Sequence, residues 1–415
     1  MDLLFTCCKN PTFNTLIDIG VKNGKITYIE EHDGRHTDAK EIIDLGGNLL
    51  LPGLVESHIH LDKAYLLDRL PGDVTTLRDA IEKTTELKHG YTAVDIEKRS
   101  LQVIRQAVNR GVTKMRCHVE IDPISQLVGL ETTLALKERV KDSIDLQIVA
   151  FPQEGIFNDD QTARLMEQAM VMGADVVGGI TYNDRDVEEH LDFVFRLAEK
   201  HNKPVDLHVD FSDRPEELAI LDVIRFTKTF GMQNRVAVGH LTSLGSVERG
   251  QAAEIAADIA RAGIHVISLP ATDLYLNGRG DNECVRRGLT PVQLLLDHKA
   301  NVVYGSNNIQ NAFTPFGTAD PLDIGFLLAQ TSHMGSEQDA LKLIEMVTTN
   351  AAASLGFQHY GVKIGADADL VVCSVNDVRT LLYTRPERER VYKKGKLVAK
   401  STIQVTSYVE ERMTT

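Results

Sequence analysis

Several features that would place this chain in a specialised class of proteins are missing from its sequence. No apolar stretch approaches the roughly 20 residues that a membrane-spanning helix needs, so we expect no membrane partner. There is no run of basic residues, and 45 lysines and arginines against 59 acidic residues give a net charge of −14. This balance argues against nucleic acid as a partner. The opening segment MDLLFTCCKN lacks a secretory signal pattern, so we expect a cytoplasmic protein.

Cysteine is also scarce, and its spacing offers no metal-binding or redox motif. The chain has 5 cysteines, an odd number, and none of them forms a CxxC pair. Free thiols in a reducing compartment explain this pattern better than disulfides or a thiolate metal site. The five are Cys7, Cys8, Cys117, Cys284 and Cys373.

Eight short apolar runs, separated by helix-like stretches, organise most of the 415 residues. Amphipathic patterns between the runs, such as 130–144 and 187–201, indicate helices. Repeated strand–helix units of this number predict an α/β fold of the TIM type, a (β/α)8 barrel with its function at the carboxyl ends of the strands. The runs are 51–55, 112–117, 146–151, 174–180, 205–207, 236–239, 265–269 and 302–305.

The two ends of the chain differ from the middle and are rich in strand signals. Residues 15–30 are typical of a hairpin around Asn23-Gly24, and residues 364–398 contain a second hairpin around Lys394-Gly395. We therefore expect one small β-sandwich domain built from residues 1–50 and 357–415. The barrel would then occupy residues 51–356.

Histidines stand at several of the predicted strand ends. His58 and His60 are two apart on one strand, so both imidazoles point to the same side. His208 ends a later strand and is the natural third ligand, since three histidines hold a divalent metal while leaving a position open for water. The alternative is that these histidines are packing or surface residues. An HxH pair alone is weak evidence for a metal site, because two histidines on a solvent-facing strand give the same pattern.

Three further polar residues at strand ends are candidates for the same site. His240 follows the next strand and is expected to orient the attacking water or polarise the substrate rather than bind metal. Gln153 carries an amide that both donates and accepts, which suits a ring amide of a heterocycle, although a loop-capping role is the alternative. His118 is equally consistent with a structural and a substrate-binding role.

Eight segments, taken in order, give the sequence a family resemblance that covers essentially the whole chain. The chain resembles the cytosine deaminases of the amidohydrolase superfamily, most specifically in IDLQIVAFPQEGIF. The HLDK that follows the histidine pair also resembles the N-isopropylammelide isopropylaminohydrolases, which act on a triazine ring. The segments are LLLPGLVESHIHLDKAYL, KMRCHVEID, IDLQIVAFPQEGIF, GADVVGGI, VDLHVDF, RVAVGHLTS, NGRGD followed by RRGLT, and FTPFGTADPL.

The resemblance implies one divalent metal, zinc or iron, and a small nitrogen heterocycle as substrate. In the family the metal ligands are the HxH pair, the strand-five histidine and a strand-eight aspartate. In this sequence the four positions are occupied by His58, His60, His208 and Asn307. The ring-binding glutamine falls on Gln153 and the hydroxide-orienting histidine on His240. We also expect a homo-oligomer.

The chain departs from this family pattern at two positions. Phe211 stands where cytosine deaminases carry a proton-shuttling glutamate, which predicts low activity on cytosine and a more apolar substrate pocket. Asn307 stands in place of the aspartate, and an amide is no general base near neutral pH. Asp62, Lys63, Asp210 and His240 are the candidates to take over proton transfer.

Two hypotheses of function follow from these residues. The first is a metal-dependent hydrolase that cleaves a C–N bond of a pyrimidine- or triazine-like ring, with metal-activated water as the nucleophile. The second is a catalytically silent relative that retains a binding pocket, because both departures remove acid–base groups. We favour the hydrolase, because the metal histidines, Gln153 and His240 are all retained.

Overall fold

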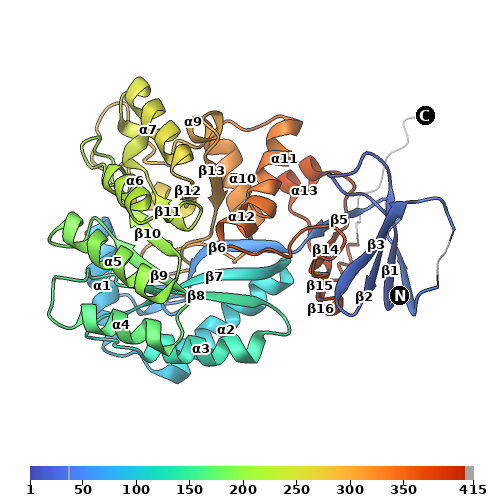
Figure 1. Ribbon diagram of the computed structural model, residues 1–415, viewed down its shortest axis with the longest axis horizontal. Helices are drawn as coiled ribbons and strands as arrows, with labels where there is room; N and C mark the ends of the chain where they lie inside the picture. Colours follow the sequence, from blue (N-terminus) through green and yellow to red (C-terminus); the bar gives the residue numbers. More distant parts are fainter. Residues whose placement is uncertain (36–37, 407–415) are drawn as a thin grey trace.

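A closed sheet of eight parallel strands forms the centre of the protein in the computed structural model, which describes residues 1–35 and 38–406 (Figure 1). The strands follow one another around the sheet in chain order. The two edges meet where Asn307 pairs with Ile59, so the predicted (β/α)8 barrel is confirmed. The strands are β6 (Leu54–His60), β7 (Val112–Glu120), β8 (Asp145–Phe151), β9 (Val176–Ile180), β10 (Val205–Val209), β11 (Val236–His240), β12 (Ile264–Ser268) and β13 (Asn301–Tyr304).

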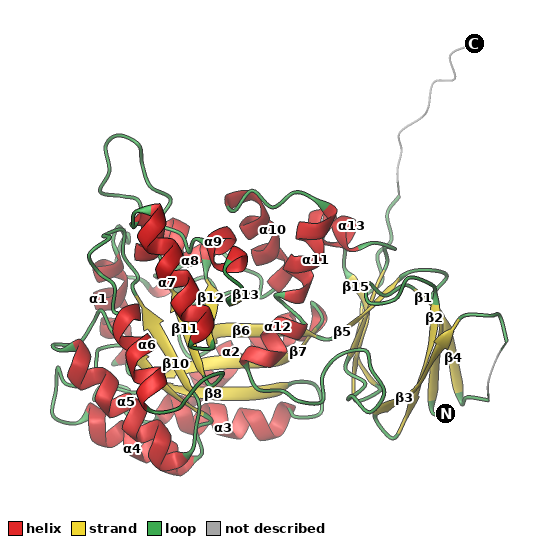
Figure 2. Ribbon diagram, turned by 45° about the horizontal axis from the view of Figure 1, so that its top comes forward, coloured by secondary structure: helices red, strands yellow, loops and turns green. Residues whose placement is uncertain are grey.

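Helices surround this sheet, as Figure 2 shows in red around the yellow strands. The amphipathic pattern predicted at 187–201 is confirmed as α5, and the pattern at 130–144 corresponds to α3. None of the described helices is long and apolar enough to cross a membrane. The helices are α1 (Leu77–Lys88), α2 (Ala93–Asn109), α3 (Val128–Val140), α4 (Thr162–Met172), α5 (Val187–His201), α6 (Ile220–Thr229), α7 (Arg249–Arg261), α8 (Pro270–Leu276), α9 (Val292–Asp297), α10 (Pro321–Thr331), α11 (Glu337–Glu345), α12 (Thr349–Ser354) and α13 (Val378–Thr384).

Two four-stranded sheets from the chain ends lie beside the barrel, on the right in Figure 1. Both predicted hairpin turns are confirmed, because β2 and β3 pair across Asn23-Gly24 and β15 and β16 pair across Lys394-Gly395. An apolar core that includes Phe5 and Tyr392 joins the sheets. The strands are β1 (Leu3–Cys8), β2 (Ile17–Lys22), β3 (Lys25–Glu31), β4 (Glu41–Asp44), β5 (Leu49–Pro52), β14 (Leu370–Cys373), β15 (Arg388–Lys393) and β16 (Lys396–Lys400).

The chain passes from the small sheets into the barrel at Gly53. The apolar run 51–55 is therefore divided between the end of β5 and the start of β6. A Cβ atom on Gly53 would come within 2.2 Å of the Thr113 hydroxyl, so the crossing requires glycine. The apolar pattern alone does not reveal this division, because both strands are buried.

A buried cluster of charges joins the small sheets to the barrel. Lys393 of β15 lies 2.7 Å from Asp369 and 2.6 Å from Asp145 of the barrel strand β8. Lys114 of β7 lies 2.7 Å from Asp145 and 3.0 Å from Asp369. Both lysines and Asp369 are buried, so each charge depends on its partners for stabilisation.

Candidate active site

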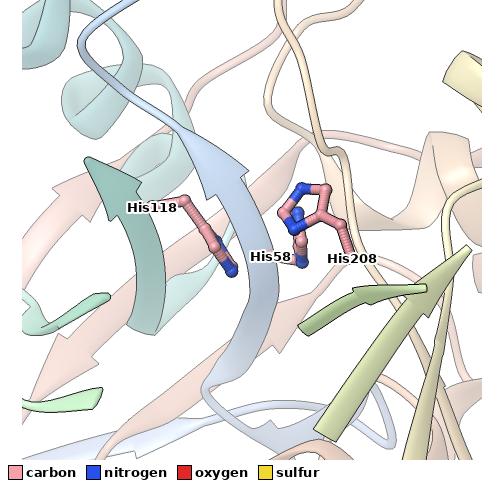
Figure 3. A group of neighbouring side chains, drawn as sticks. All are labelled: His58, His118 and His208. Atoms are coloured by element: carbon pink, nitrogen blue, oxygen red, sulfur yellow. The ribbon is translucent and has the colours of Figure 1, made fainter. Parts of the chain in front are cut away.

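The strand-end histidines meet inside the barrel. The side-chain nitrogens of His58, His118 and His208 lie within 4.8 Å of one another, and Figure 3 shows the three side chains together. The Nε2 atom of His60 lies 3.3 Å from Nε2 of His208. Two ligands of a tetrahedral metal with bonds of roughly 2.0–2.1 Å lie about 3.3–3.4 Å apart, so the spacing of this pair matches that of two ligands of one ion.

The protonation state of these imidazoles also suits a cation. Burial lowers the pKa of His58, His60 and His208 well below the usual value for histidine, and neighbouring positive groups lower it further. Each ring is therefore neutral at physiological pH and offers a lone pair. In the part of the chain that the structure describes, both nitrogens of His58 and Nδ1 of His60 and His208 are buried with no hydrogen-bond partner, which is costly unless a ligand satisfies them.

His118 differs from His58, His60 and His208 because its ring forms a hydrogen bond with a carboxylate. Its Nε2 lies 3.1 Å from Asp206, whose other oxygen accepts a hydrogen bond of 2.7 Å from Arg116. The ring stacks on His58 with centroids 3.8 Å apart. His118, predicted as a substrate-binding residue, thus belongs to the histidine cluster and packs against His58.

Asn307 closes the barrel next to the histidines. Its backbone N–H donates to His58 and its carbonyl accepts from His60, both at 2.8 Å. Its φ of 58° lies in the left-handed region, which asparagine tolerates better than most residues. Its side-chain Oδ1 is buried without a partner. The amide oxygen of Asn307 is therefore available to a ligand, although it carries no charge.

A small cavity opens beside this cluster and gathers most of the predicted site. His60, His208 and Asn307 lie at one end, while Lys63 and Gln153 contribute a second polar wall. The remaining side is largely apolar, and Lys63 lies over the Phe313 ring at 4.3 Å. The other lining residues are Leu77, Tyr182, Phe211, His240, Thr272, Asn308 and Phe313.

Lys63 and Gln153 form a buried pair on that polar wall. The Lys63 ammonium donates to Gln153 Oε1 at 2.8 Å and to Glu120 Oε1 at 2.7 Å. Because an ammonium group only donates, the atom of Gln153 that faces it must be the amide oxygen. The orientation of the amide is thereby fixed, and its NH2 group is left for the cavity.

The Glu120 carboxylate extends this polar wall toward helix α1. Lys88, the last residue of α1, lies 2.8 Å from Glu120 and 2.9 Å from Asp122, and it also contacts Glu154. Burial alone raises the pKa of Glu120, but Lys63 and Lys88 outweigh it and lower that pKa to about 2. The network joins α1, which supplies Leu77 to the cavity, to the loop that carries Gln153.

Asp210 and Phe211 follow His208 and point in different directions. The Asp210 carboxylate accepts from the backbone N–H groups of Ala219 and Ile220 at the start of α6, at 2.8 and 3.2 Å. Burial raises its pKa to about 7. Phe211 lines the cavity and stacks on His240, with centroids 4.0 Å apart and ring planes 11° apart. Phe211 thus contacts the site, whereas Asp210 anchors the following helix.

His240 has a partner that the sequence analysis missed. Its Nδ1 lies 2.7 Å from Oδ1 of Asp273, a fully buried residue in α8. Burial raises the pKa of Asp273, and the contact with His240 opposes that rise. No periodic signal marks this aspartate, because it lies in a short helix after strand β12 rather than at a strand end. The sequence ATDLYL gives no indication of its contact with a histidine 33 residues away.

Comparison with known proteins identifies the family of this chain. The model of the Amidohydrolase family matches residues 84–399, which is more than half of the chain. The chain belongs to this family. Within the described part of the chain, the amidohydrolase brings together a buried group of histidines that could hold a metal ion.

Individual relatives resemble the amidohydrolase over nearly its whole length. It is 27% identical to N-isopropylammelide isopropyl amidohydrolase of Pseudomonas sp. (strain ADP), over 94% of this chain and 96% of the relative. It is 28% identical to pterin deaminase of Rhizobium rhizogenes, over 86% and 82%. The crystal structure of 5-methylcytosine deaminase from Klebsiella pneumoniae with 5-fluorocytosine superimposes with a TM-score of 0.93, at 29% identity, covering 98% and 99% of the two chains.

Proposed function

We propose that this amidohydrolase cleaves the bond between a ring carbon and an exocyclic nitrogen of a small oxo-substituted pyrimidine or triazine. Water would attack the ring carbon and release ammonia or an amine. The observation that carries the proposal is the cavity itself, which has buried imidazoles at one end and an oriented Lys63–Gln153 pair on its wall. The names of the relatives, a 5-methylcytosine deaminase and an N-isopropylammelide hydrolase, support the same class of substrate.

The metal would be zinc or iron, held by His58, His60 and His208 with the Asn307 amide oxygen nearby. These residues fit a divalent cation because their unpartnered donor atoms are buried and their imidazoles are neutral. A bound divalent cation supplies Lewis acidity, which makes water a nucleophile near neutral pH. His118 keeps His58 in position through its contact with Asp206.

The Lys63–Gln153 pair defines the ring edge that the site accepts. The ammonium and the Gln153 NH2 group are both donors, since Gln153 Oε1 is already engaged by Lys63. The matching substrate edge therefore carries acceptors, such as carbonyl oxygens or a deprotonated ring nitrogen. On the edge opposite the reacting carbon, cytosine presents a ring N–H beside its carbonyl, and this N–H would face one of the two donors. An acidic dioxo ring, once deprotonated, satisfies both donors, and its negative charge offsets positive charge in the site.

The size and the apolar wall of the cavity restrict the substrate further. The cavity is small, which favours a single ring as the substrate. Leu77, Tyr182 and Phe211 belong to one apolar cluster at this wall. Phe211 cannot carry a proton. The apolar wall therefore suits a substrate with an alkylamino leaving group better than one whose ring must be protonated there.

The test is amine release by protein with a measured metal content. The protein would be loaded with Zn²⁺ or Fe²⁺ and assayed with N-isopropylammelide and with cytosine. We expect about one metal per chain and faster release from the dioxo ring. The His208→Ala variant should lose both metal and release. Metal-loaded protein that binds N-isopropylammelide without releasing amine would favour the silent relative. Cytosine turnover near ~10 s⁻¹, typical of enzymes, would contradict the assignment of the ring edge.

A further inference from the structure

Asp273 is a buried carboxylate beside the cavity whose geometry fixes the proton of His240. Its Oδ1 lies 2.7 Å from His240 Nδ1, while its Oδ2 is buried and none of the described residues forms a hydrogen bond with it. An ionised carboxylate only accepts, so the proton of the neutral imidazole must be on Nδ1. The Nε2 atom then carries a lone pair, and His240 is a residue of the cavity wall.

A second buried aspartate–histidine pair shows what a structural version of this contact looks like. Asp184 lies 2.7 Å from His190 Nδ1, the same distance as in the first pair. There, however, His190 Nε2 accepts the backbone N–H of Ile180 at 2.9 Å, and the carboxylate also accepts backbone N–H groups of the 156–157 segment. Every site of the structural pair is thus used by the fold, whereas one oxygen of Asp273 is not.

We propose that Asp273 is a positioning residue that makes His240 the proton carrier of the reaction, in place of the carboxylate that Asn307 lacks. This inference rests on the proposed hydrolytic function. The chain has lost an anionic base where the barrel closes, yet it places an anion behind the histidine of the same cavity. The negative charge stabilises the imidazolium that forms when Nε2 takes a proton, without competing for the metal ligands.

The proton balance of the step is complete without another reagent. His240 Nε2 takes one proton from the attacking water as its oxygen bonds to the ring carbon. The C–N bond then breaks, and the same proton passes from Nε2 to the departing nitrogen. Water and the amino-substituted ring become the oxo-substituted ring and a free amine. Asp273 stays ionised throughout and lends only its charge and its fixed position.

The first experiment is a double-mutant cycle with Asp273→Asn and Asn307→Asp, using N-isopropylammelide as substrate. In the native background Asp273→Asn should lower kcat by about 10²–10⁴-fold, the usual contribution of a general acid–base group, with little change in KM. In the Asn307→Asp background, Asp273→Asn should lower kcat by less than about tenfold, because the carboxylate at position 307 accepts the proton instead. Equal losses in both backgrounds would overturn the inference.

The matched control is Asp184→Asn, which removes the same charge from the structural pair. Both variants should lose thermal stability, measured by circular dichroism, because each disrupts a buried hydrogen bond. Only Asp273→Asn should lower kcat in the folded protein. If Asp184→Asn lowers kcat as strongly, the effect of Asp273 is structural and the inference is wrong.

The tautomer of His240 gives a readout that needs no substrate. Two-bond ¹H–¹⁵N spectra of the protein at pH 8, with the His240 signals identified by their loss in His240→Gln, should show the Nδ1–H form. In Asp273→Asn the Nε2–H form should gain population, because an amide either donates or accepts. An Nε2–H tautomer in the native protein would overturn the inference. If native protein shows the Nδ1–H form but releases no amine, the proposed function fails while the positioning of His240 stands.

Discussion

Lys88 offers a sharp test of how the active-site wall is held together. Its Nζ contacts Glu120, Asp122 and Glu154, and its side chain is fully buried. Replacing Lys88 with methionine keeps the side-chain volume but leaves the three carboxylates with one lysine, Lys63, which pairs with Glu120 and not with Asp122 or Glu154. Breaking a buried ion pair costs about 3–5 kcal/mol of unfolding free energy, because the remaining charge is uncompensated.

The structure places Lys88→Met at the lower end of that range. Glu120 keeps Lys63, and Asp122 keeps backbone hydrogen bonds of 2.8 Å from Ile124 and Ser125. Glu154 retains 21% of its side-chain exposure and so loses less from the missing partner. We therefore expect a loss of about 3 kcal/mol at pH 8. This is a large share of the roughly 5–15 kcal/mol that stabilises a typical protein.

The loss should depend on pH in a direction that the carboxylates determine. Lys88 and Lys63 lower the pKa of Glu120 to about 2, so this carboxylate stabilises the native protein above its unfolded pKa of about 4.3. Burial already raises the pKa of Glu154 and Lys88 opposes that rise, so without Lys88 the pKa of Glu154 rises further above its unfolded value. The resulting penalty grows as pH rises through the raised pKa and is relieved by protonation below it. The destabilisation should therefore be smaller at pH 5.5 than at pH 8.

The assay is urea unfolding followed by circular dichroism, since the chain contains no tryptophan for fluorescence. The matched control is Arg78→Met on the exposed face of the same helix, where Arg78 pairs with Glu82 in solvent. This control should change the midpoint little, because exposed pairs are screened. A loss below about 1 kcal/mol for Lys88→Met at pH 8, or a larger loss at pH 5.5, would refute the reasoning.

Three further substitutions test other parts of the molecule. Asn307→Asp should raise metal affinity, measured by competition with a chelator, and should raise amine release by less than the ~10²–10⁴-fold of a general acid–base group, because His240 already carries the proton; no change in either quantity would favour a silent relative. Phe211→Glu should give measurable cytosine turnover at a cost in melting temperature, and inactivity with bound metal would show that a shuttling carboxylate is not what is missing. Lys393→Met should lower the unfolding free energy by about 3–5 kcal/mol, because Asp369 and Asp145 share this lysine, whereas Lys396→Met at the exposed start of β16 should not.

The fold was predictable because each strand repeats one local pattern. Short apolar runs that stop at polar residues mark barrel strands, and Asn23-Gly24 is a turn signal with a known backbone preference. The boundary at Gly53 was not predictable in this way. It depends on the close approach of Thr113, a residue 60 positions away, and two buried strands in succession form one continuous apolar run.

The site was predictable as a set of strand ends but not as a set of contacts. Strand ends of a parallel barrel converge, so His60, His208 and His240 could be placed together from sequence. The capping role of Asp210 and the pairing of Lys63 with Gln153 depend on side-chain directions that periodicity does not specify. Asp273 shows the same limit, because a residue within a short connecting helix has no positional signal in the sequence.

The charges of the site suggest a second effect of Asn307, on the charge of the substrate that binds. Lys63 is neutralised by Glu120, and the imidazoles that would hold the metal are neutral. Asp273, which lies beside the cavity behind His240, would only partly oppose a divalent cation there, so the site would remain positive. An anionic ring, the substrate that the Lys63–Gln153 pair favours, cancels that charge. A carboxylate at position 307 would cancel it before substrate bound. Asn307→Asp should therefore raise KM for acidic dioxo rings while it raises kcat, and equal gains on neutral and anionic rings would contradict this electrostatic account.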